Sequence, residues 1–294
     1  MLFQKIFRIG IFTAIFAAFF LQNSAPIEGE LFPIEISQSR EFAANSFLPD
    51  LPELPPVERP SANFAKFADK FDARNLEVSI FANDPMIDLS EIQNCKSVLE
   101  RTLSSLPNEL TASLDEMELY FSRKTPRGLA NSHLVELRCA DIATDELVAV
   151  FVHELGHVVD LGHLRGESLA PSEFVDGKIQ IAADDPSVAF YRLSWRDEST
   201  KKRLAERRDF VSGYAMSDPF EDFAETFNFF VLHGADFRKI KKESPVLAAK
   251  YNFFKNVVFG GVEFDSTLTA TTGKRVWDAT LVAIDRTEFF ARRN

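Results

Sequence analysis

The stretch from Asp145 to Gly162, DELVAVFVHELGHVVDLG, constrains the fold of this chain more than any other segment. Hydrophobic residues fall on nearly every side of an α-helix formed here, which predicts a helix buried inside a folded domain. We expect Thr144 or Asp145 to cap its first turn. Two histidines and a glutamate lie in its middle, and such side chains are costly to bury unless a partner satisfies them.

These residues, His153, Glu154 and His157, form an H-E-x-x-H motif. Positions four apart on an α-helix share a face, so the two imidazoles can bind one metal ion. Glu154 lies about 100° round the helix and can reach a water molecule beside the metal without being a ligand. Zinc is the expected ion, because two imidazoles and a carboxylate with one open position are a common catalytic set. The motif has only three fixed positions and also occurs by chance, but its buried context favours the metal site over structural histidines.

A catalytic zinc site needs a third protein ligand, for which there are two candidates. His163 follows His157 by six residues, as in the metzincin pattern H-E-x-x-H-x-x-G-x-x-H. In this chain Asp160 stands where that pattern has its glycine. The other candidate is Glu221, which shares a helix face with Glu225 in the apolar segment PFEDFAETFNFFVL. A helix this apolar rarely buries carboxylates without a partner, so Glu221 is favoured.

Two motifs resemble those of a known family. The sequence HELGHVVD is followed by Y-x6-E-x-F-A-E-x-F over Tyr214–Phe227, a pairing similar to that of the lethal-factor-like zinc metallopeptidases, which include the bacterial Pro-Pro endopeptidases. The resemblance covers about residues 75–260, and only the two motifs are specific. It implies that zinc is bound by His153, His157 and Glu221.

The resemblance also implies the roles of the neighbouring residues. Glu154 would be the general base, and Tyr214 would donate a hydrogen bond to the oxyanion of the tetrahedral intermediate. Glu225 would orient a ligand histidine, and Asp160 could do the same. The sequence thus predicts a zinc metalloendopeptidase acting on peptide or protein substrates. A non-catalytic zincin-fold binding protein at the cell surface is the alternative, although the presence of Glu154 and Tyr214 counts against it.

The N-terminal segment predicts export. Residues 1–25 combine a basic start with an apolar run, as in a signal peptide, and an uncleaved membrane anchor over residues 6–21 is the alternative. Either places the protein outside the cytoplasm, secreted or membrane-attached. Residues 26–60 are predicted to be a Pro-rich linker, 61–260 the metallopeptidase domain and 261–294 a C-terminal extension with no informative motif.

Composition and cysteine content add two constraints. Of the 294 residues, 46% are hydrophobic and 26% charged, as in an ordinary globular protein. The net charge of −11 argues against a nucleic-acid partner. Cys95 and Cys139 are the only cysteines, and export would permit a disulfide between them. Two free buried thiols are nearly as well supported.

We expect an α+β fold of the zincin type, with a small mixed sheet, the motif helix and a helical C-terminal part. Strands are predicted at 76–81, 117–121 and 133–138, with a turn at 125–130 and a hairpin turn at 175–178. Helices are predicted at 91–106 (capped by Ser90), from 185 to 191, and at 201–210, 219–232 and 244–259. By analogy with zincins, an edge strand before the motif helix would line the substrate groove.

Overall fold

A computed structural model describes residues 65–71, 76–82, 88–123, 125–265 and 276–291. The predicted signal or anchor segment and the Pro-rich linker lie outside the described residues. Within the described residues, every helix is too short or too polar to cross a membrane.

A five-stranded mixed sheet forms one layer of the structure. Its strand order is β1-β2-β3-β5-β4, with the strands β1 (Ala65–Phe71), β2 (Leu76–Ala82), β3 (Glu116–Phe121), β4 (Gly128–Ala130) and β5 (Leu134–Arg138). The three central strands are parallel, and both edge strands run antiparallel to their neighbours. The three predicted strands are confirmed. The predicted turn at 125–130 is partly wrong, because its second half pairs with β5 as the edge strand β4.

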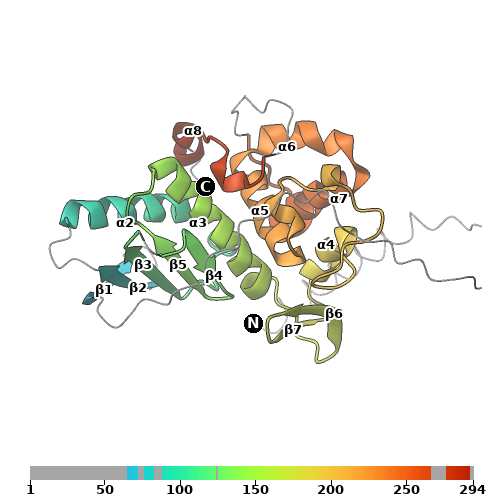
Figure 1. Ribbon diagram of the computed structural model, residues 1–294, viewed down its shortest axis with the longest axis horizontal. Coiled ribbons are helices and arrows are strands. Elements are labelled where there is room, and N and C mark those ends of the chain that lie inside the picture. Colours follow the sequence, from blue (N-terminus) through green and yellow to red (C-terminus); the bar gives the residue numbers. More distant parts are fainter. Residues whose placement is uncertain (1–64, 72–75, 83–87, 124, 266–275, 292–294) are drawn as a thin grey trace, which may run out of the picture. The chain divides into compact units, whose positions relative to one another are not determined.

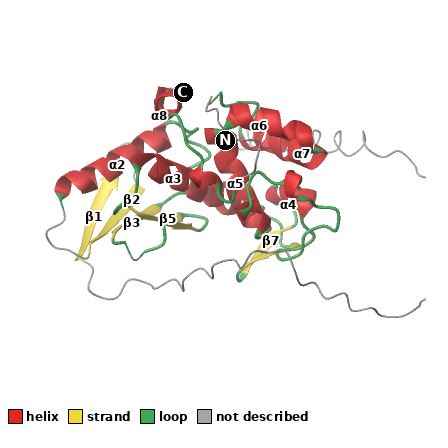
Figure 2. Cartoon of the chain, turned by 45° about the horizontal axis from the view of Figure 1, so that its top comes forward, coloured by secondary structure: helices red, strands yellow, loops and turns green. Residues whose placement is uncertain are grey.

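Two helices cover one side of this sheet, α2 (Leu89–Ser104) and α3 (Thr144–Val158) (Figures 1 and 2). Both predicted caps are wrong. Asp88, not Ser90, caps α2, and its side chain accepts a hydrogen bond from the backbone of Ser90. The N-cap of α3 is Ala143, whose side chain cannot cap the helix. Thr144 and Asp145 lie one and two positions further on, inside the helix.

The two cysteines form a disulfide. Cys95 lies in α2 and Cys139 directly after β5, so the bond ties the helix to the end of the central sheet. It joins positions 44 residues apart, and a cross-link over a segment of this length restricts the unfolded chain strongly. Of the two alternatives left open by the sequence, the structure therefore has the disulfide.

After α3 the chain continues as a π-helical turn, η1 (Val159–His163), and then enters a helical part. This part begins with the hairpin β6 (Pro171–Asp176) and β7 (Ile179–Ala182). The predicted hairpin turn is confirmed, and Gly177 supplies its positive φ of 56°.

The helices that follow gather around α5. The central helix is α5 (Pro219–Leu232), and around it lie α4 (Ser187–Ser194), α6 (Gly234–Ile240) and α7 (Pro245–Phe253) with its π-helical continuation η5 (Phe254–Val258). The last helix, α8 (Arg286–Ala291), lies apart from this group. The helices predicted from 185, at 219–232 and at 244–259 are confirmed. The α+β class with a small mixed sheet and several helices is likewise confirmed.

The helix predicted at 201–210 is wrong. Only a short 3-10 turn, η2 (Arg207–Asp209), forms there. The segment instead runs as turns beside α4, with a β-bridge between Trp195 and Lys201. Its basic side chains offer no apolar stripe that would pack a helix onto the core, and local propensity alone is too weak to form one.

Phenylalanine rings fill the interface between α4, α5, α7 and η5. Phe190, Phe223 and Phe254 are fully buried and contact one another with ring centroids 4.9–5.5 Å apart. Beside this aromatic core lies an ion pair without solvent exposure, in which Lys250 contacts both carboxylate oxygens of Asp222 at 2.6 and 2.8 Å. Many of the chain's phenylalanines therefore pack in the core.

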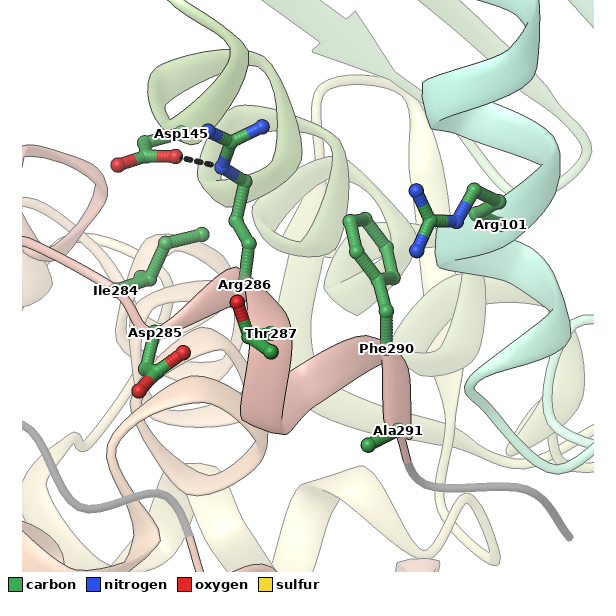
Figure 3. Close-up of a pocket in the computed structure, with 8 residues that line it drawn as sticks. All are labelled: Arg101, Asp145, Ile284, Asp285, Arg286, Thr287, Phe290 and Ala291. Carbon is green, nitrogen blue, oxygen red and sulfur yellow. Dashed lines mark ion pairs between the residues drawn. The ribbon is translucent and has the colours of Figure 1, made fainter.

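Near its end the chain returns to the first layer. Helix α8 packs beside α2 and α3, where Arg286 pairs with Asp145 and the guanidinium of Arg101 lies 4.2 Å above the ring of Phe290 (Figure 3). The surface pocket between these elements contains neither motif histidine.

Removing one partner of the buried ion pair should destabilise the protein strongly. Lys250→Met leaves the Asp222 carboxylate buried without its cation, which costs about 3–5 kcal/mol. Chemical denaturation of the purified protein measures the change. The double variant Lys250→Met/Asp222→Asn should recover part of the loss, and a single variant within about 1 kcal/mol of wild type would contradict the assignment.

Candidate metal centre

Three side chains from two helices converge at one point. His153 and His157 lie on α3, and Glu221 lies in the first turn of α5. The Oε2 atom of Glu221 is 3.2 Å from Nε2 of His153 and 3.7 Å from Nε2 of His157. One possible ligand atom from each residue lies within 4.8 Å of the others, and no further such group occurs among the described residues.

The close approach of α3 and α5 produces this geometry. Gly156 faces α5 so closely that a Cβ atom built on it would lie 2.8 Å from Cα of Ala224. Gly156 precedes His157, and Ala224 lies between Glu221 and Glu225. The missing side chain therefore lets the histidine face of one helix meet the glutamate face of the other.

Glu225 orients His153. Its Oε1 lies 3.0 Å from Nδ1 of His153, and its Oε2 accepts a hydrogen bond of 2.8 Å from the backbone N–H of Ala279. A proton on Nδ1 directed at this carboxylate leaves the lone pair on Nε2, the atom that faces Glu221. This hydrogen bond is compatible with the orienting role that the resemblance implies for Glu225.

The start of α5 positions Glu221. Asp218 caps the helix, accepting hydrogen bonds from the backbone N–H groups of Phe220 and Glu221 at 2.9 and 2.8 Å, and Pro219 occupies the first helical position. The hydroxyl of Tyr214 donates to Oε1 of Glu221 at 3.0 Å. With Oε1 occupied in this way, Oε2 is left facing the histidines.

Glu154 lies beside this group without belonging to it. It is buried, and its side chain passes directly over β4, since a Cβ atom on Gly128 would lie 2.3 Å from its Oε1. Burial raises the pKa of Glu154, while His153 and His157 oppose that shift. A carboxylate in this setting is a stronger base than one in water.

Two residues singled out from the sequence lie elsewhere. His163 is exposed at the end of η1 and does not belong to the three-residue group. Asp160 is buried, but its Oδ2 accepts a 2.7 Å hydrogen bond from the hydroxyl of Tyr191. Among the described side chains, no hydrogen bond joins Asp160 to His157, so the suggested orienting role of Asp160 gains no support.

The electrostatics of the three residues favour a cation. Burial opposes charge on Glu221, but His157 and His153 outweigh it and hold the pKa of Glu221 well below its usual value. Burial also disfavours protonation of His153, yet the carboxylates of Glu221 and Glu225 raise its pKa well above the ordinary value. The carboxylates thus attract positive charge to this point.

The donor set fits a zinc ion. Glu221 Oε2 is buried and has no hydrogen-bond partner, while the Nε2 atoms of His153 and His157 face it. Two imidazole nitrogens and one carboxylate oxygen are a common zinc ligand set. A bound cation would satisfy the buried oxygen and both nitrogens at once.

The C-terminal segment contributes to the centre, which the sequence interpretation missed. The backbone of Tyr214 donates to the carbonyl of Trp277 at 2.6 Å, and Ala279 donates to Glu225. Asp278 forms an ion pair with Arg127, the residue directly before β4. No motif in residues 261–294 predicts these three contacts, because two of them use backbone atoms.

No protein-family model, no curated protein and no solved structure matches this chain.

Replacing Glu221 should abolish metal binding. Glu221→Gln keeps the shape of the side chain but removes its charge, and we expect zinc content to fall from about one ion per chain to near zero after dialysis. Atomic absorption of the purified protein measures it. His163→Gln is the matched control and should keep its zinc. If His163→Gln lost zinc and Glu221→Gln kept it, His163 would be the third ligand.

Proposed function

We propose that this protein is a zinc-dependent metalloendopeptidase with a zincin-type fold. The observation that carries the proposal is the convergence of His153, His157 and Glu221, with Glu225 fixing one imidazole. Glu154 and the Tyr214 hydroxyl, the two groups that peptide hydrolysis would use, lie beside it. The resemblance of the two sequence motifs to lethal-factor-like metallopeptidases supports the same conclusion.

When bound, zinc supplies a Lewis acid that acidifies water and polarises a carbonyl group. His153, His157 and Glu221 would hold it. Glu154 accepts the proton of the attacking water and returns it to the nitrogen of the leaving amine. Its burial suits this role, because the raised pKa of this carboxyl makes it a better proton acceptor and then a proton donor near neutral pH.

Tyr214 stabilises the developing negative charge. Burial, and the neighbouring Glu221 carboxylate, raise the pKa of Tyr214 well above its usual value, so the hydroxyl keeps its proton. For this role the hydroxyl would turn from Oε1 of Glu221 to the carbonyl oxygen that becomes an oxyanion. Such a hydrogen bond contributes about 3 kcal/mol to catalysis in typical cases.

The substrate would bind along β4. This strand is the last of the sheet, so its outer edge can pair with an extended peptide. Gly128 in β4 contacts Glu154 closely, and a peptide paired with β4 would therefore pass beside the general base. Activity is proposed to lie outside the cytoplasm, which the Cys95–Cys139 disulfide and the apolar segment near the N-terminus support.

Loss of the general base should abolish turnover and spare metal binding. Glu154→Gln should retain its zinc and lose at least about 100-fold in kcat on a peptide library, because proton transfer contributes that much or more. Glu167→Gln, which changes an exposed glutamate, is the control and should match wild type. Unchanged hydrolysis by Glu154→Gln would refute the mechanism, and absence of chelator-sensitive hydrolysis by wild type would favour a non-catalytic protein.

Loss of the tyrosine hydroxyl should act on the transition state. Tyr214→Phe should lower kcat about 100-fold with zinc content and KM nearly unchanged, as expected for a lost oxyanion donor. Steady-state kinetics and metal analysis measure these quantities. Tyr120→Phe removes a hydroxyl that bonds Glu118 in the sheet and should keep full activity. An equal loss in both variants would point to a general structural effect instead.

A further inference from the structure

The hairpin β6–β7 has one face that is buried at its base and open at its tip. Side chains alternate along a strand, so Phe174 and Asp176 point the same way from β6. Ile179 pairs with Asp176 across the hairpin and shares that face with Ile181. Phe174 and Ile181 are buried, whereas Asp176 is half-buried and Ile179 is 54% exposed. The tip therefore leaves an acidic and an aliphatic side chain partly exposed to solvent.

This hairpin is anchored to the end of the helix that carries the histidines. Phe174 packs against the ring of Tyr191, with centroids 5.0 Å apart, and the Tyr191 hydroxyl donates to Asp160, three residues after His157. Figure 1 shows the hairpin beside the C-terminal end of α3. The hairpin is thus held beside the end of α3 that carries His157.

The half-buried Asp176 carboxyl interacts electrostatically with two of the three grouped residues. Burial raises the pKa of Asp176, with an opposing effect from His157 and a further rise from Glu221. Asp176 is outside the group that could hold the ion. Its carboxylate has no ion-pair or hydrogen-bond partner among the described side chains. By contrast, Glu173 on the opposite face of β6 is paired with Arg192.

We infer that Asp176 and Ile179 form a binding position for a lysine or arginine side chain of the substrate, next to the bond that is cleaved. The inference rests on the proposed function. The aliphatic stem of such a side chain would pack on Ile179, and its charged end would pair with the Asp176 carboxylate. The net charge of −11 would also favour the approach of a cationic peptide.

A matched peptide set tests the inference. Each peptide carries lysine, norleucine or glutamate at one position near the cleaved bond. Wild type should cleave the lysine peptide with a kcat/KM about tenfold above that of the norleucine peptide, as expected for one charged hydrogen bond. In Asp176→Asn this ratio should fall to about one, and Asp176→Lys should favour glutamate. Glu173→Gln removes an equal charge from the opposite face and should keep the wild-type ratio.

Binding supplies a readout that needs no turnover. Calorimetry with the zinc-loaded Glu154→Gln variant should show about tenfold tighter binding of the lysine peptide than of the norleucine peptide, and Glu154→Gln/Asp176→Asn should lose the difference. If wild type cleaves peptides without this preference, or Asp176→Asn retains it, the basic-residue site is refuted and the metallopeptidase proposal stands. If wild type cleaves none and Glu154→Gln binds none, both fail.

Discussion

The contact between α3 and α5 is the interaction on which the rest of the structure depends. Gly156 lets the two helices approach until their backbones nearly touch, and only at that separation can imidazoles from one helix and a carboxylate from the other reach a common point. The sheet supports one side of α3, and the aromatic core supports the far side of α5. Both layers therefore hold the spacing between the two halves of the candidate metal centre.

Helix α5 has its rotation fixed by three different environments. Glu221 and Glu225 face the histidines, Asp222 pairs with Lys250, and Phe223 enters the aromatic core. If the helix rotated, at least one buried carboxylate would lose its partner, which is costly in a medium of low dielectric constant. Buried charge thus serves to orient the proposed ligand, in addition to any chemistry at the site.

Prediction from the sequence succeeded where a pattern is strong and local. The motif helix and the helix at 219–232 are indicated by their nearly continuous apolar residues, and the three inner strands by short runs of strand-forming residues. It failed at helix caps, because a helix can start a residue or two earlier without changing its apolar pattern. It also failed at 201–210, where good helix formers have no core to pack against. It also missed the C-terminal segment, because Ala279 and Trp277 act through backbone atoms that carry no sequence signal.

The sequence by itself determined that His153 and His157 share a face, and that Glu221 and Glu225 share another, because helical periodicity depends only on residues a turn apart. Only the tertiary structure decided that these two faces meet, that Glu221 and not His163 lies beside the imidazoles, and that Cys95 bonds Cys139. Such contacts join residues 44 to 72 positions apart. They are set by how the helices and the sheet pack, which no local pattern encodes.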